Sequence, residues 1–103
     1  MMKHALLIAT LAATFPAAPA FASDDLMKKS GCNACHAVDK KIVGPGFKEV
    51  AAKYKGDAKA EAMLVDKVKK GGVGTWGQVP MPPNAAVKDD DIKALVKWIL
   101  AMK

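Results

Sequence analysis

Two thiols and one imidazole fall within five consecutive residues, Cys32-Asn33-Ala34-Cys35-His36. A Cys-x-x-Cys pair followed directly by histidine is the attachment signature of a c-type haem. The two sulfurs can form thioether bonds to the two vinyl groups of a haem, and the imidazole can then offer a nitrogen to the iron. The cluster therefore predicts one haem attached covalently through Cys32 and Cys35, with His36 beneath the ring.

Three other functions use the same residue types and stay open at this point. A Cys-x-x-Cys pair in an exported protein can form the redox-active disulfide of a thiol–disulfide oxidoreductase. The histidine after the pair, and the lack of alternating strand and helix patterns, weigh against that function. A zinc site is a poorer alternative, because two cysteines and one histidine leave no good fourth ligand. A haem sensor or small-ligand binder would have the sixth iron position open or easily vacated.

A second axial ligand for the iron is expected from Met81. Without the first 22 residues, His36 is the chain's only histidine, so a second histidine ligand within one chain is excluded. Met81 lies between Pro80 and Pro82, whose fixed φ angles stiffen the backbone on both sides. The remaining methionines of the mature chain fall in expected helices, where methionine usually fills gaps: Met27, Met63 and Met102. Ligation by His36 and Met81 would leave no open iron position, which predicts an electron carrier of fairly high potential and not an enzyme.

The first 22 residues have the pattern of a secretory signal peptide. Lys3 precedes an uncharged run that ends in Ala20-Phe21-Ala22, an A-x-A pattern expected to be cleaved after its last residue. An uncleaved membrane anchor is the alternative, and two prolines in the run disfavour it. We expect residues 1–22 to be removed and residues 23–103 to form one periplasmic domain that does not stay inserted in a membrane.

Size and charge narrow the class of protein further. The mature chain would have 103 − 22 = 81 residues, a length at which side chains alone build a marginal core, so the domain is expected to need its cofactor to fold. All 16 basic residues are lysines, and without Lys3 the mature charge is 15 − 10 = +5. Such a surface suits an acidic protein partner, whereas nucleic acid is disfavoured for an exported chain without arginine. A purely solubilising role for the lysines is the alternative.

The fold class expected from these patterns is all-α, with extended loops. Four segments carry helical periodicity or capping residues: 23–29, 47–55, 57–70 and the segment from 89 onward. Serine and aspartate are expected to cap three of these helices: Ser23-Asp24-Asp25, Asp57 and Asp89-Asp90-Asp91. Glycines and prolines predict loops at 44–46 and 71–87, and the apolar residues of the second loop indicate that it is ordered.

Together these motifs resemble those of the small bacterial class I c-type cytochromes, in particular the periplasmic cytochrome c-551 type. The resemblance rests on CNACH, VGPGF and WGQVPMPPN and covers the whole mature chain. It implies the class I cytochrome c fold, with about four short helices and long loops wrapped around one covalent haem c. It also implies a monohaem, His/Met-ligated carrier that moves electrons between respiratory complexes and terminal reductases or oxidases.

The resemblance further implies roles for single residues. Cys32 and Cys35 would carry the haem, and His36 and Met81 would be the axial ligands of its iron. The carbonyl of Pro45 would accept a hydrogen bond from the His36 ring and fix its tautomer.

Other residues would contact the haem less directly. Asn84 would donate to the Met81 sulfur or hold its loop, and Trp76 would donate its indole N–H to a haem propionate or serve as simple core. Lys67 stands where relatives often have an arginine near that propionate, and a lysine is a weaker, non-bidentate partner. The first and last helices are expected to cross beside the haem through three residues: Leu26, Leu95 and Ile99.

Protein redox partners with acidic docking surfaces are expected. Examples are a cytochrome bc1-type donor and a nitrite reductase, oxidase or peroxidase acceptor, each meeting a monomer of this chain. The exposed haem edge would be framed by small apolar residues: Ala34, Val38, Val79 and Pro82. A ring of lysines would steer the partner: Lys28, Lys29, Lys40, Lys41 and Lys67.

Overall fold

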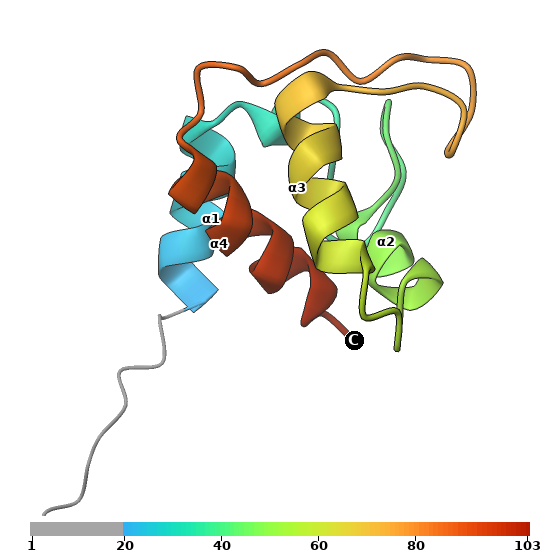
Figure 1. Cartoon of the computed structure of the whole chain (residues 1–103), viewed down its shortest axis with the longest axis horizontal. Coiled ribbons are helices and arrows are strands. Elements are labelled where there is room, and N and C mark those ends of the chain that lie inside the picture. The colour runs from blue at the N-terminus through green and yellow to red at the C-terminus, as the bar shows by residue number, and fades with distance from the viewer. Residues whose placement is uncertain (1–19) are drawn as a thin grey trace, which may run out of the picture.

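A computed structural model describes residues 20–103, with side chains from residue 23 onward. It contains four α-helices and one short 3-10 turn: α1 (Ala20–Lys29), η1 (Cys32–Ala34), α2 (Phe47–Lys53), α3 (Ala60–Lys70) and α4 (Asp89–Leu100). No strand occurs within residues 20–103. The predicted all-α fold is confirmed, and Figure 1 shows the long loops that connect the helices.

Helix α4 is the element on which the other helices pack. It contacts α1, α2 and α3, and its apolar residues recur at helical spacing on the side that faces them. Ile92 and Val96 are only 0% and 1% exposed and form one cluster with Val50 of α2 and Leu64 of α3. This cluster joins three helices on one side of the cofactor pocket described below.

The predicted crossing of the first and last helices is confirmed. Leu95 of α4 is buried in a cluster with Met27 of α1 and Phe47 of α2, and Leu26 and Ile99 pack against it partly buried. Met27 is 5% exposed, so its flexible side chain is a core residue. Figure 1 shows α1 and α4 lying across one another.

The predicted cap at Ser23 is wrong, because Ser23 lies within helix α1 and not at its start. Helix α1 spans Ala20–Lys29, so three of its residues precede the serine. Asp24 therefore lies within the helix, where it pairs with Lys28 at 3.0 Å. The expected signal peptide, residues 1–22, lies outside the described residues apart from these first helical positions. Among the helices of residues 20–103, none combines the length and hydropathy needed to span a bilayer.

The other two predicted caps are also wrong. Asp57 accepts a hydrogen bond at Oδ1 from the backbone N–H of Lys59 at 2.9 Å, and α3 starts only at Ala60. Its side chain therefore closes a turn ahead of the helix. The residue before α4 is Lys88, which makes no side-chain cap, and Asp89-Asp90-Asp91 occupy the first turn. There the carboxylates complement the positive end of the helix dipole without capping it.

The loop between α3 and α4 is ordered, as predicted, and turns back on the end of α3. Gly72 and Met81 pair through two backbone hydrogen bonds, with N···O distances of 3.1 and 2.8 Å. Farther along, the backbone N–H of Asn84 donates to the carbonyl of Val68 in α3 at 3.1 Å. Figure 1 shows this segment, in orange, arching past α3 before it enters α4. The loop thus places Met81 beside the carboxyl end of α3.

Candidate haem-binding site

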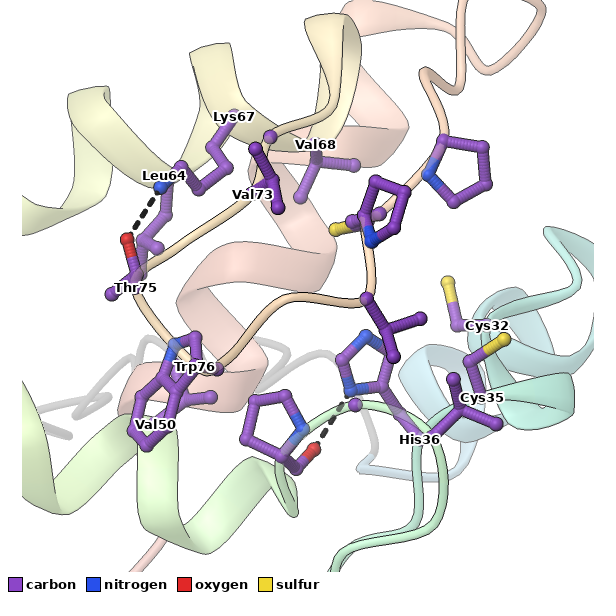
Figure 2. Close-up of a pocket in the computed structure, with 18 of the residues that line it drawn as sticks. Cys32, Cys35, His36, Val50, Leu64, Lys67, Val68, Val73, Thr75 and Trp76 are labelled. Atoms are coloured by element: carbon purple, nitrogen blue, oxygen red, sulfur yellow. Dashed lines mark hydrogen bonds between the residues drawn. The ribbon is translucent and has the colours of Figure 1, made fainter.

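One apolar pocket brings together most of the residues that the sequence predicted for the site. Seven of the eight line it: Cys32, Cys35, His36, Pro45, Lys67, Trp76 and Met81. In Figure 2 the two cysteines lie on one side and Trp76 on the other, with the His36 ring between them. Residues 49 positions apart in the chain, from Cys32 to Met81, therefore share one cavity.

The His36 ring is held by the segment that follows the cysteine motif. Its Nδ1 lies 2.7 Å from the Pro45 carbonyl oxygen, the contact that the resemblance implied. Because a carbonyl oxygen only accepts, Nδ1 carries the proton and the other ring nitrogen, Nε2, is left with a lone pair for a metal. The ring also stacks on Phe47, with centroids 5.1 Å apart and planes inclined by 22°. The imidazole is thus fixed in both tautomer and orientation.

Gly44 lets the backbone pack flat against this imidazole. A Cβ at that position would lie 2.5 Å from Cε1 and 3.0 Å from Nδ1 of His36. Contacts this short require the ring or the backbone to move. The glycine of the VGPGF motif is therefore explained by close approach to the ring.

A Gly44→Ala variant is expected to displace the His36 ring and to lower the free energy of unfolding by about 1–3 kcal/mol. Gly56→Ala is the control, because Gly56 has a φ of +78° but a Cβ there would meet nothing within 4 Å. It carries only the backbone cost of a left-handed residue, about 1–2 kcal/mol. Urea unfolding compares the two, and a perturbed haem spectrum in the first variant alone would identify the steric contact. An unchanged spectrum and stability in Gly44→Ala would contradict this prediction.

The two cysteines are both partly buried. Burial raises the pKa of the Cys32 thiol above its ordinary value, so this sulfur is protonated at neutral pH. A redox-active Cys-x-x-Cys motif requires the opposite, a thiol whose pKa is lowered. This environment argues against the thiol–disulfide oxidoreductase alternative.

Asn84 lies outside the pocket lining and holds the loop that carries Met81. Its side-chain amide donates to the carbonyls of Val68 at 3.1 Å and Pro82 at 3.3 Å. Of its two predicted roles, the structure contains the second, a tie between α3 and the loop. At the other end of the loop, Gly71 has a φ of +78°, and a Cβ there would overlap the Met81 carbonyl oxygen.

Lys67 and Trp76 face the pocket from the side opposite the cysteines. The Lys67 ammonium donates to Thr75 Oγ1 at 2.9 Å, a bond drawn in Figure 2. The Trp76 ring is partly buried against the Val50 cluster, and the Lys53 ammonium lies 5.6 Å from its centroid. Trp76 therefore packs against the core and also lines the pocket, and its hydrogen bond to a haem propionate stays a prediction.

The apolar rim of the pocket differs in part from the prediction. Val79 and Pro82 line it, with Val79 64% exposed. Val38 instead packs partly buried against the Met27 cluster, away from the pocket. Two rim residues were missed, Val43 and Val73, which are 46% and 62% exposed. Each of these valines is next to a glycine in a loop. That sequence pattern could have indicated that they form an exposed apolar edge.

These residues fit a c-type haem. The thiols lie on one wall, an imidazole nitrogen is free on the same segment, and the Met81 thioether belongs to the opposing loop. Apolar side chains complete the cavity, as a flat macrocycle requires: Val50, Leu64, Val68, Leu95, Val96 and Ile99.

Comparison with known proteins gives matches along most of the chain. The family model described as cytochrome c matches residues 22–103. Cytochrome c-551 of Allochromatium vinosum is 65% identical over 77 residues, 75% of this chain and 82% of that protein. Cytochrome c-551 of Pseudomonas aeruginosa is 50% identical over 105 residues, which cover both chains completely. The crystal structure of wild-type Nitrosomonas europaea cytochrome c552 has a TM-score of 0.75 and 52% identity, covering 78% of this chain and 99% of that one.

Proposed function

Because this chain belongs to the cytochrome c family, as a small class I c-type cytochrome with one covalently bound haem c, we propose that it is a periplasmic one-electron carrier. The observation that carries the proposal is the single pocket lined by both cysteines, His36 and Met81. Electron transport is the role that the family implies. A pocket that brings both cysteines together with both expected iron ligands supports that role for this chain.

Five residues of the pocket each have a defined part in this proposal. When bound, haem c supplies one-electron iron chemistry. Cys32 and Cys35 would hold the group covalently, and His36 and Met81 would be the two protein ligands of its iron. The Pro45 carbonyl keeps His36 in the tautomer that ligation needs. With both positions filled, no site is left for a substrate, which supports a carrier over an enzyme.

Electrons are proposed to leave through the exposed apolar rim. Val43, Val73 and Val79 are all more than 45% exposed and line the pocket. Lys40 and Lys41 are exposed on the segment that leads to Val43, so positive charge stands beside the rim. This arrangement suits a protein partner with an acidic surface around an apolar contact.

The five lysines proposed for steering are not equivalent. Lys28 is paired with Asp24 at 3.0 Å, so part of its charge is already compensated. Lys67 donates to the neutral Thr75 hydroxyl at 2.9 Å, which holds its side chain in place and leaves its charge intact. We propose a cytochrome bc1-type donor and a nitrite reductase, oxidase or peroxidase acceptor, each docking to a monomer.

Export is part of the same proposal. Residues 1–22 would be the cleaved signal peptide and residues 23–103 the haem domain. The family match supports this division, because it begins at residue 22, one residue before the proposed mature start. The periplasm is also where covalent haem proteins and their partners would meet.

Absorption spectra of the exported protein test the proposal. Sharp α and β bands in the reduced form, and a weak far-red band in the oxidised form, are expected for a His/Met-ligated c-type haem. The pigment should stay on the polypeptide in acidified acetone, and the reduced native protein should not bind carbon monoxide. A colourless protein would favour thiol chemistry, and ready carbon monoxide binding would favour a sensor, so either result would overturn the proposal.

A further inference from the structure

We propose that Lys69 is a positioning residue for the Met81 loop, defined as residues 80–84. Its ammonium ties the carboxyl end of α3 to the segment between this loop and α4. The inference rests on the proposed role of Met81 as an iron ligand, and it adds a residue that has no contact with the pocket itself.

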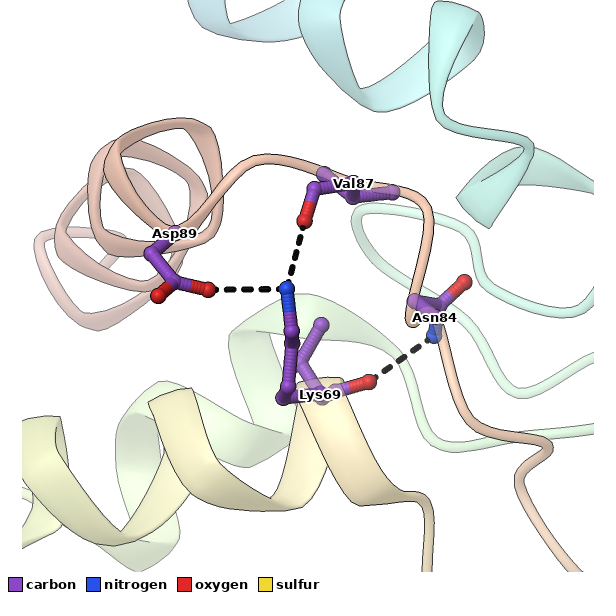
Figure 3. A network of polar contacts seen from close by, with 5 residues as sticks. Lys69, Asn84, Val87 and Asp89 are labelled. Atoms are coloured by element: carbon purple, nitrogen blue, oxygen red, sulfur yellow. Dashed lines mark hydrogen bonds and ion pairs between the residues drawn. The ribbon is translucent and has the colours of Figure 1, made fainter.

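The contacts of Lys69 set it apart from Lys70, its neighbour on α3. Its Nζ donates to the Val87 carbonyl at 3.1 Å and pairs with Asp89 Oδ1 at 2.8 Å. Its side chain is 35% exposed, whereas that of Lys70 is 73% exposed and pairs with Asp66 within α3 itself. Figure 3 shows the Lys69 ammonium between the Val87 carbonyl and the Asp89 carboxylate. Lys69 thus joins two elements, while Lys70 joins neighbours on one helix.

A series of hydrogen bonds leads from this ammonium to Pro82, the residue that follows Met81. Val87, held at its carbonyl by Lys69, donates its N–H to the Asn84 carbonyl at 3.1 Å. The Asn84 amide in turn donates to the carbonyl of Pro82 at 3.3 Å, and Pro82 directly follows Met81. The same amide donates to the Val68 carbonyl at 3.1 Å. Two consecutive residues of α3, Val68 and Lys69, therefore hold this segment at two points.

Few other hydrogen bonds hold the Met81 loop in place. Three of its five residues are prolines, which lack a backbone N–H. On the upstream side, the loop is anchored by the paired backbones of Gly72 and Met81. Loss of the Lys69 contacts would leave the Val87 carbonyl and the Asp89 carboxylate without this partner. The downstream anchor would loosen, and the loop could open while the helices stay packed.

Amide hydrogen exchange of the haem-loaded protein tests this inference. In Lys69→Leu, the N–H groups of Met81 and Gly72 should exchange at least about tenfold faster than in the wild type. The N–H of Val96, in the buried middle of α4, should change much less. Lys70→Leu is the matched control, because it removes the same charge from the same helix turn. Exchange in Lys69→Arg should stay close to the wild-type rate, because arginine keeps the charge and the hydrogen-bond donors.

A second measurement follows the ligand bond directly. On heating, oxidised Lys69→Leu should lose its far-red band at a lower temperature than its helical circular dichroism. In Lys70→Leu the midpoints of these two transitions should lie closer together. Unchanged exchange at Met81 would overturn the inference. So would an equal acceleration in Lys70→Leu, or an acceleration of Val96 by the same factor as Met81. Absence of the far-red band from the wild type would instead refute the ligand role of Met81, and the exchange measurement would still decide the role of Lys69.

Discussion

A Met81→Ala variant is expected to lose the weak far-red band of the oxidised protein. Its reduction potential should fall by on the order of 0.2 V, a part of the roughly 0.8 V over which axial ligands move haem potentials. The reason is that a thioether is a soft ligand that favours Fe(II), and water or no ligand would replace it. Met81 lines the pocket together with His36 and is held there by its backbone pairing with Gly72. The variant should also bind carbon monoxide when reduced, because one iron position opens.

Met63→Ala is the control for this result. Met63 lies on α3, is 40% exposed and is absent from the pocket lining, so its removal should leave both spectrum and potential unchanged. Visible spectra and potentiometric titration of the two variants make the comparison. A Met81→Ala protein with the wild-type potential would show that another side chain, such as a lysine, occupies the sixth position.

The residues of the pocket lining that could be predicted from the sequence are those whose placement depends on local geometry. Cys32, Cys35 and His36 must lie together wherever the chain goes, because they fall within five consecutive residues. The two prolines around Met81 likewise restrict the backbone before any tertiary contact forms. The helical stripe of α4 could be identified for a similar reason, since its period is set by the helix alone.

The parts that could not be predicted depend on contacts between distant segments. Lys67 donates to Thr75, and Lys69 bonds to Val87 and Asp89, but five lysines follow residue 55 before α4 begins. Nothing in the local sequence separates Lys67 and Lys69 from the other three lysines. The predicted caps failed for a related reason, because serine and aspartate favour several positions near a helix start, and the rest of the chain decides which one they take.

A Cys32→Ala/Cys35→Ala double variant is expected to lose most of its helical circular dichroism, the largest structural effect predicted for this chain. The mature domain of about 81 residues should have a stability of roughly 4–12 kcal/mol, from 0.05–0.15 kcal/mol per residue. The pocket walls come from α2, α3 and α4 and are largely apolar: Val50, Leu64, Val68, Leu95, Val96 and Ile99. Val50, Leu64, Leu95 and Val96 are at most 9% exposed, so the expected loss comes from the walls opening when no covalently held porphyrin lies between them. Each side chain exposed in this way costs about 1.5–3 kcal/mol. Exposure of two or three such side chains would cancel a stability in the lower half of that range.

Circular dichroism of the double variant, made without haem, measures this loss against the wild type. Asn33→Ala is the control, because Asn33 lies between the two cysteines and is exposed, so its haem and helices should be retained. A single Cys32→Ala variant keeps one thioether and should be intermediate in thermal stability. A haem-free double variant that keeps native helicity and melts cooperatively would show that the helices pack against α4 without the cofactor. In that case the cofactor would occupy a pocket already built by the cluster of Val50, Leu64, Ile92 and Val96.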